Sequence, residues 1–255
     1  SLGCLMHVFI PSKARAKTST YKLLQAAGHQ VTHFVEPQDK AAYQAAEVPG
    51  LHVLPANDQG IAFVRNHMLD TARKQGIKWF WMVDDDVNGF GTAKAGKTIK
   101  GTAQVLTDFH SKVEEYKFPI NGINYCQYAW SYSTSKKRFV VNRKTAEVCT
   151  LLYVPKITWQ YRKRLNLKED RDFCMQSIQH SDGIMFDTCS WFNCPGVGTN
   201  TGGLQSLYQE QRDHQAAAGL AAEWAPWTKL IKKKDRVDCK LDLPGYAKSL
   251  NRIVK

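Results

Sequence analysis

The stretch WFWMVDDDVNGF, residues 79–90, decides the fold because it places three acidic residues directly behind a run of large apolar side chains. A strand that is apolar at nearly every position is typical of a parallel sheet covered on both faces. Neighbouring carboxylates repel one another, so the arrangement is costly unless a cation or a ligand neutralises it. The stretch therefore predicts a buried strand at Lys78–Val83 whose carboxyl end carries a binding site.

The residues before this strand alternate between strand-like and helix-like patterns. The apolar residues of Ile61–Ala72 fall on one helical face, and Gly76 ends that helix. Alternation of strand and helix favours an α/β fold with a mostly parallel central sheet and helices on both faces. We expect earlier strands at Cys4–Ile10, His29–Pro37 and Leu51–Pro55, and earlier helices at Thr20–Ala27 and Ala41–Ala46.

The second half of the sequence is less regular. GTAKAGKTIKG (residues 91–101) has the composition of a mobile loop, and PGVGTNTGG (residues 195–203) is rich in glycine. The end of the chain is basic, with the run IKKKDR. We expect helices at Ala103–Glu115, Asp170–His180 and Leu204–Trp224, and strands within Ile120–Trp130, Lys137–Pro155 and Gly183–Phe192.

Composition points to an anionic partner. The 255 residues include 35 Lys and Arg against 23 Asp and Glu, which gives a net charge of +12. Such an excess suits nucleic acid or nucleotide phosphate, although a basic protein without a polyanion partner remains the alternative. No run of 18 apolar residues occurs, and the start lacks a basic segment, so we expect neither a membrane-spanning helix nor a signal peptide. Seven cysteines without a C-x-x-C pair suggest reduced thiols and a cytoplasmic protein.

Polar side chains follow several of the predicted strands. Ligands of parallel sheets bind beyond the carboxyl ends of the strands, where Asp84–Asp86 also lie. Asp84 and Asp86 point to the same side if the strand continues, and their carboxylates suit Mg²⁺ or Mn²⁺ together with a diphosphate. The alternative is a cluster of aspartates that caps a turn. Residues with side chains suited to phosphate, base or ribose are Ser12, Lys13, Arg15, Lys17, Glu36, Arg65 and Asn66.

A second acidic group, KEDRDF, occupies Lys168–Phe173 at the start of a predicted helix. Acids in a first helical turn are normal because they stabilise the helix dipole. The functional interpretation is a carboxylate that accepts a proton from an attacking hydroxyl, with Asp170 preferred over Glu169 and Asp172. Backbone N–H groups near Gly202 and Gly203 suit a phosphate or sugar, although a plain turn fits equally well. Possible third metal ligands are His180 and His214, although each is more typical of a surface histidine.

The ordered set IPSKAR, FVEP, NDQGIAFVRN, WFWMVDDD, KEDRDF and GTNTGG resembles the TET-associated glycosyltransferase family. Members of this family have a GT-A-like (Rossmann-like) fold, are found largely in phages, and attach sugars to 5-hydroxymethylpyrimidines in DNA. The resemblance spans about Val8–Gly203. Because the sequence has no internal repeat and no low-complexity linker, we expect one domain over residues 1–255, with a nucleotide-sugar-binding half (1–100) and an acceptor and catalytic half (101–255). The resemblance also implies a divalent metal, a UDP-sugar donor, and the host cytoplasm as the location.

Residue roles carried over from the family fall on the same positions. Asp84 and Asp86 match the metal-binding DxD pair, and Asp84 and Asp85 lie at the nucleotide sugar. Glu169 and Asp170 match the acidic pair beside the acceptor. Ala14 departs from the pattern, because a glycine is expected in this loop. The resemblance implies nucleotide contacts by Ser12, Arg15, Glu36 and Arg65. The full set expected at the nucleotide sugar also includes Pro11, Asn66, Gly202 and Gly203.

Hydroxymethylated DNA is the acceptor that the resemblance and the charge jointly favour, with hydroxymethylcytosine preferred. A modified base in duplex DNA is reached by extrusion, and aromatic side chains then stack on it. Other acceptors remain open, namely protein or glycan, as do an inactive transferase fold that binds DNA and a metal-dependent nuclease. Aromatic candidates for base stacking, each equally suited to a core position, are Tyr125, Tyr128, Trp130 and Tyr132.

Overall fold

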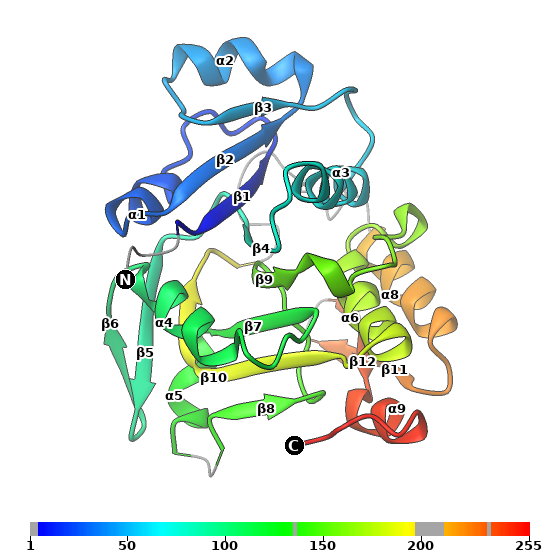
Figure 1. The fold of residues 1–255 in the computed structure, drawn as a ribbon. Helices are drawn as coiled ribbons and strands as arrows, with labels where there is room; N and C mark the ends of the chain where they lie inside the picture. The colour runs from blue at the N-terminus through cyan, green and yellow to red at the C-terminus, as the bar shows by residue number, and fades with distance from the viewer. Residues whose placement is uncertain (1–4, 135–136, 197–211, 234–235) are drawn as a thin grey trace.

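The computed structural model describes residues 5–134, 137–196, 212–233 and 236–255. Within these residues ten strands form one sheet, with the order β3-β2-β1-β4-β9-β7-β10-β5-β6 and with β8 paired to β10 (Figure 1). A separate two-stranded sheet pairs β11 with β12. The large sheet therefore takes strands from both halves of the chain.

The first four strands are parallel, as the sequence predicts. β1 lies between β2 and β4, and β3 pairs with the outer side of β2. Their carboxyl ends consequently meet at one edge of the sheet, where the polar residues that follow them gather. The four strands are β1 (His7–Ser12), β2 (Gln30–Val35), β3 (Leu51–Val53) and β4 (Trp79–Val83).

Helices cover both faces of the sheet, because strand residues point alternately to either side. Phe9 and Phe80 pack toward α3 and α6, whereas Val8 and Trp81 pack toward α1 and α4. The mixed α/β architecture with two covered faces is the predicted one. The helices of these layers are α1 (Thr20–Ala26) and α4 (Gln104–Val113) on one face, and α3 (Ile61–Lys74) and α6 (Glu169–His180) on the other.

The second half makes the sheet mixed. β9 pairs antiparallel with β4, with Val83 opposite Cys149. This register brings the loop before β9 against the acidic triplet, and the N–H of Asp84 donates to the carbonyl of Val148 at 2.9 Å. Further strands are β7 (Ile120–Tyr125), β8 (Phe139–Val141), β9 (Cys149–Tyr153) and β10 (Ile184–Asn193).

Two local predictions are wrong. The expected mobile loop at residues 91–101 is a hairpin of β5 (Gly89–Lys94) and β6 (Lys97–Lys100), and its two turn residues Ala95 and Gly96 have positive φ. The strand expected through Trp130 stops at Tyr125 and continues as helix α5 (Cys126–Tyr132). The spacing of Cys126 and Ala129, which pack together in one apolar cluster, is helical.

Beyond β10 the described chain forms a small unit at one end of the sheet. Helix α8 (Arg212–Glu223) packs against the hairpin of β11 (Thr228–Lys233) and β12 (Arg236–Leu241), and α9 (Leu243–Ser249) follows (Figure 1). The first part of the helix expected at Leu204–Trp224 lies outside the described residues. None of the helices in the described ranges is long and apolar enough to cross a membrane. Shorter helical segments are α2 (Lys40–Ala45) and 3₁₀ turns at Pro37–Asp39, Val154–Lys156 and Lys163–Leu165.

Candidate active site

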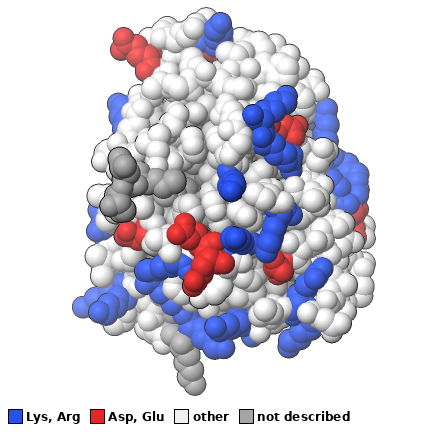
Figure 2. Space-filling model, viewed as in Figure 1, with Lys and Arg blue, Asp and Glu red and all other residues white. Residues whose placement is uncertain are grey.

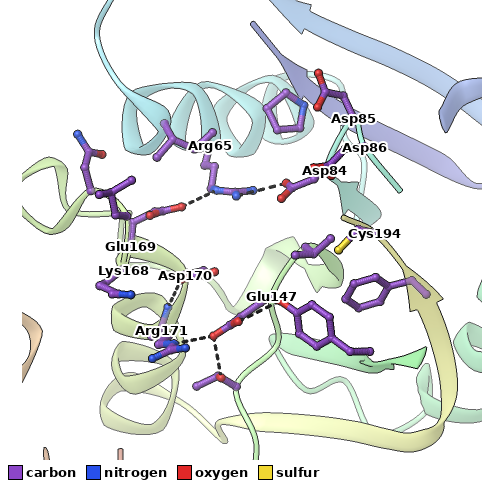
Figure 3. A pocket seen from close by; sticks show the side chains of 18 of the residues that line it. Arg65, Asp84, Asp85, Asp86, Glu147, Lys168, Glu169, Asp170, Arg171 and Cys194 are labelled. Carbon is purple, nitrogen blue, oxygen red and sulfur yellow. Dashed lines mark hydrogen bonds and ion pairs between the residues drawn. The ribbon is translucent and has the colours of Figure 1, made fainter. Parts of the chain in front are cut away.

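A cavity of about 1550 Å³ lies where the carboxyl ends of β1, β2 and β4 face the start of α6. Its wall includes both acidic groups of the sequence, Asp84–Asp86 behind β4 and Glu169 and Asp170 on α6. Figure 3 shows these groups on facing sides of the cavity. The fold therefore joins two acidic segments that are far apart in the chain.

Arg65 of α3 links the two acidic groups. Its Nη2 lies 3.4 Å from Oδ1 of Asp84, and its Nε lies 3.2 Å from Oε1 of Glu169 (Figure 3). The third guanidinium nitrogen, Nη1, lies 2.9 Å from Sδ of Met82. The residue is only 7% exposed, so its charge is compensated inside the protein rather than by water. One buried guanidinium thus fixes the separation of the acidic groups.

The three aspartates that follow β4 in the sequence have different surroundings. Asp85 turns toward β1, where it accepts hydrogen bonds from Oγ of Ser12 at 2.5 Å and from Nη1 of Arg15 at 2.7 Å. Asp86 lies 3.7 Å from the same guanidinium. Burial raises the pKa of Asp84 to about 7, even though Arg65 opposes the rise, and the charges of Asp86 and Asp85 add to it. The triplet therefore favours an additional positive charge at Asp84 and Asp86.

On the facing side, Asp170 lies at the start of α6 with its carboxyl group in the cavity (Figure 3). Oδ1 accepts a hydrogen bond from the backbone N–H of Arg171 at 2.8 Å. Burial raises the pKa of Asp170 well above its ordinary value, and the neighbouring carboxylates of Glu147 and Glu169 add to the rise. A carboxyl group with a raised pKa is suited to proton transfer near neutral pH.

Glu147, which sequence reasoning missed, is the neighbour of Asp170. Its Oε1 accepts hydrogen bonds from Nε of Arg171 at 2.8 Å and from Oγ1 of Thr145 at 3.2 Å, and Tyr125 donates to Oε2 at 3.3 Å. Burial disfavours its charge, but the charge and hydrogen bond of Arg171, together with Thr145 and Lys168, outweigh burial and lower the pKa of Glu147. The two carboxyl groups thus have pKa values shifted in opposite directions, a pattern common in acid–base pairs.

The backbone is strained next to this group. Val148 and Leu167, which both line the cavity, have φ values of 64° and 74°, a region that branched side chains avoid. The N–H of Cys149 donates to the carbonyl of Glu147 at 2.6 Å, which closes a tight turn around Val148. Strain of this kind gathers at functional sites, where it fixes a side chain in position. Here the contacts of Glu147 with Arg171 and of Val148 with Asp84 hold the strained turn in place.

The family model of TET-associated glycosyltransferases matches residues 6–198, about three quarters of the chain. The chain belongs to this family. It is therefore a glycosyltransferase, and the cavity holds the acidic segments of the matched region. A search of curated proteins finds no match. Helix α8, the β11–β12 hairpin and α9 lie beyond the matched residues.

Two carboxylates of this TET-associated glycosyltransferase fit a divalent cation. Asp84 and Asp86 would supply oxygen ligands, and burial, together with the charges of Asp86 and Asp85, raises the pKa of Asp84. The described ranges contain no group of three His, Cys, Asp or Glu side chains arranged as a metal cage. Mg²⁺ often takes only one or two carboxylates and completes its shell with phosphate and water, so the set fits. The proposed third ligands His180 and His214 are exposed and do not line the cavity.

The predicted nucleotide-sugar residues fall into two groups. Pro11, Ser12, Arg15 and Glu36 line the cavity with Arg65 and the aspartates. Glu36 is ordered by the N–H of Asp58, which lies 3.1 Å from Oε1. The polar groups at the ends of β1 and β2 are therefore held in place before any ligand binds.

Other predicted residues lie elsewhere. Asn66 does not line the cavity, and its amide exchanges hydrogen bonds with the backbone of Tyr161. Asp172, in the first turn of α6, is fully buried, pairs with Arg162 and accepts a hydrogen bond from Trp224 at 2.8 Å. Lys17 is exposed outside the cavity. Gly202 and Gly203 lie outside the described residues.

Ala14 has a φ of 52°. This φ lies in the left-handed region, where an L-residue is strained. The strain explains why the family pattern leads us to expect glycine at this position. The N–H of Ala14 donates to Oδ2 of Asp39 at 2.9 Å, which holds the loop in this conformation. The departure from the pattern therefore carries an energetic cost in this chain.

Proposed function

We propose that this glycosyltransferase transfers a sugar from a UDP-sugar to the hydroxyl group of 5-hydroxymethylcytosine in DNA, in a divalent-metal-dependent reaction. The observation that carries the proposal is the Arg65 bridge, which sets Asp84 and Glu169 on opposite sides of one cavity. One side supplies ligands for a cation and a diphosphate. The other supplies a carboxyl group for the acceptor.

On the donor side, Asp84 and Asp86 are the residues that would hold Mn²⁺ or Mg²⁺, which would neutralise the diphosphate leaving group. Ser12 and Glu36, at the ends of adjacent parallel strands, offer hydroxyl and carboxylate groups to the nucleoside. Arg15 adds positive charge next to Asp86. This end of the cavity thus combines groups for the nucleoside and for the phosphates.

On the acceptor side, Asp170 accepts the proton of the hydroxymethyl group. As the acceptor oxygen forms its bond to the anomeric carbon, the bond from that carbon to the diphosphate oxygen breaks, and the hydroxyl proton moves to the carboxylate. Burial raises the pKa of Asp170, and the nearby negative charge of Glu147 adds to the rise. Arg171 in turn holds Glu147 in place. Asp170 therefore has an affinity for the proton that ordinary surface aspartates lack.

The acceptor proposal is supported by size, charge and aromatic groups. A cavity of about 1550 Å³ has room for a nucleotide sugar and an extruded base. Tyr128 lines it and is 52% exposed, so its ring is available for stacking, whereas Tyr125 is held by Glu147. Trp130 is exposed but lies outside the cavity, and the side chain of Tyr132 is not among those described.

A direct test incubates hydroxymethylcytosine-containing DNA with a panel of UDP-sugars and Mn²⁺, followed by mass analysis of the nucleosides. We expect a sugar on hydroxymethylcytosine, and a rate reduced about 10²- to 10⁴-fold in Asp170→Asn. The matched control Asp108→Asn, on the outer surface of α4, retains the wild-type rate. Sugar found on polypeptide or glycan while the DNA stays unmodified would refute the DNA acceptor. Full activity in EDTA would refute the metal.

A further inference from the structure

Net charge alone does not single out a binding surface on this protein. Figure 2 shows Lys and Arg side chains spread over the face seen in Figure 1 rather than gathered in one patch. The β11–β12 hairpin differs from this background, because its basic residues are placed opposite one another. In its antiparallel register Lys229 pairs with Lys240, and Lys233 pairs with Arg236. Directly opposite like charges destabilise a sheet, so the arrangement calls for a neutralising anion.

These four cations share one face of the hairpin, since residues of the other face alternate with those of this one. Among the described hairpin residues, Asp238 is the one acidic residue on the face that carries the four cations. It already contacts Nη1 of Arg171 at 2.8 Å and Nζ of Lys168 at 3.4 Å, besides Lys233 at 2.8 Å. Although burial disfavours its charge, these cations lower the pKa of Asp238. One shared carboxylate leaves the face with a large positive excess.

The two members of the Lys229–Lys240 pair have fewer partners than the other two cations. Arg236 lies 3.7 Å from Asp213, and Lys233 contacts Asp238. Within the described ranges, no carboxylate is within ion-pairing distance of Lys229 or Lys240, and both are exposed. Their charges are therefore directed to solvent or to a ligand.

The hairpin also lies beside the active site. Lys233, Arg236 and Lys240 line the cavity together with Asp170 and Arg171 of α6. The contact between Asp238 and Arg171 attaches the cationic face to the acceptor side of the cavity, away from the ends of β1 and β2. An anion on this face would thus accompany the acceptor rather than the donor.

We propose that the hairpin face formed by Lys229, Lys233, Arg236 and Lys240 binds the phosphodiester backbone of the acceptor nucleic acid. The proposal rests on the DNA acceptor proposed above, and it assigns a role to a segment outside the family match. Cations four residues apart on a strand are about 13.6 Å apart, so the four cations form two rows that can contact several phosphates of a polyanion.

The test compares Lys229→Gln/Lys240→Gln with the matched control Lys22→Gln/Lys112→Gln, whose lysines are exposed on α1 and α4. Binding to an unmodified DNA 20-mer is measured over a range of salt concentrations, and transfer to modified DNA is measured in parallel. We expect the hairpin variant to bind DNA about ten-fold or more weakly at low salt and to lower the salt slope by about 1.4 to 1.8. Its KM for modified DNA rises by a similar factor, and its thermal midpoint is unchanged or higher.

Wild-type DNA affinity and salt slope in the hairpin variant would overturn the proposal, and so would an equal loss in the control variant. Tighter binding of poly-glutamate than of DNA by the wild-type protein would overturn the nucleic-acid partner. A hairpin-dependent loss of DNA binding in a protein that transfers no sugar to DNA would support the hairpin surface and refute the proposed function. Sugar transfer to DNA with hairpin-independent binding would support the proposed function and refute the hairpin surface.

Discussion

Replacing Arg65 by methionine removes a buried charge that contacts acidic groups on both sides of the cavity. The guanidinium contacts Asp84 at 3.4 Å and Glu169 at 3.2 Å, and it is 7% exposed. Methionine retains much of the aliphatic volume, so the lost charge dominates the effect. Removal of one partner from a buried ion pair costs about 3–5 kcal/mol, because the remaining charge is left without compensation. The free energy of unfolding of a typical domain is about 5–15 kcal/mol, so this loss is a large share of the stability.

The assay is urea unfolding in EDTA without donor, so that no ligand compensates the acids. With an m value of about 3 kcal/mol/M, a loss of about 4 kcal/mol lowers the midpoint by about 1.3 M. The matched control is Arg73→Met on the same helix, where the guanidinium is more exposed and pairs with Asp70 at 2.9 Å. An exposed pair contributes only about 0–1 kcal/mol, so the control shifts the midpoint much less.

A second variant separates charge from packing. Adding Asp84→Asn and Glu169→Gln to Arg65→Met removes the acids that the single change leaves without a partner. We expect this triple variant to regain more than half of the lost free energy, since replacing a complete buried ion network is often nearly neutral. An Arg65→Met protein within about 1 kcal/mol of the wild type would refute the role of Arg65 as the compensating charge. A triple variant no more stable than the single one would refute it equally.

Three further outcomes are expected. Asp86→Ala lowers sugar transfer by about 10²-fold or more at saturating Mn²⁺, because a cation ligand is lost, and unchanged turnover would contradict the assignment. Glu147→Gln moves the acidic limb of the pH–rate profile to lower pH. The lost negative charge lowers the raised pKa of Asp170, so the base stays ionised in more acidic solution; a limb that stays put or moves upward would argue against this coupling. Ala14→Gly raises the free energy of unfolding by about 0.5–1 kcal/mol, since glycine tolerates a φ of 52°, and a loss of stability in urea would count against strain at this loop.

The side of the cavity that we assign to the donor could be predicted from the sequence, because it depends on local patterns and one general rule. Strand β4 is apolar throughout, and the segments around it alternate between strand and helix. Parallel strands place their following loops at one edge, so Ser12, Glu36 and Asp84 had to be near one another. Asn66 fell outside the site because a helical residue one position from Arg65 faces a different direction.

Glu147 was missed for a physical reason. Its position depends on the antiparallel register that sets Cys149 opposite Val83, and nothing local in the sequence specifies that pairing. The positive φ of Val148 is likewise imposed by tertiary contacts, because valine has no preference for it. Register and strain therefore explain why sequence reasoning left out Glu147 and Val148. For Ala14, only the glycine expected from the family pattern pointed to the positive φ.

The C-terminal hairpin was not predicted, because its sequence is strongly basic. The segment Thr228–Lys233 carries three lysines, and such composition usually indicates a solvated end rather than a strand. Packing of the hairpin against α8 and the contact of Asp238 with Arg171 outweigh that tendency. Two of these lysines, Lys229 and Lys233, belong to the face to which we assign phosphate binding. Local preference and function often conflict at such sites.

The central claim is that the donor diphosphate binds in one cavity, at the aspartates that follow β4 and opposite Asp170. Crystals soaked with Mn²⁺ and UDP test this most directly through the anomalous signal of manganese. We predict manganese bound by Asp84 and Asp86 and by the diphosphate, with the open side of the cavity at Asp170 and the hairpin face of β11 and β12. Manganese and diphosphate bound elsewhere on the protein, with Asp84 still paired only to Arg65, would contradict it.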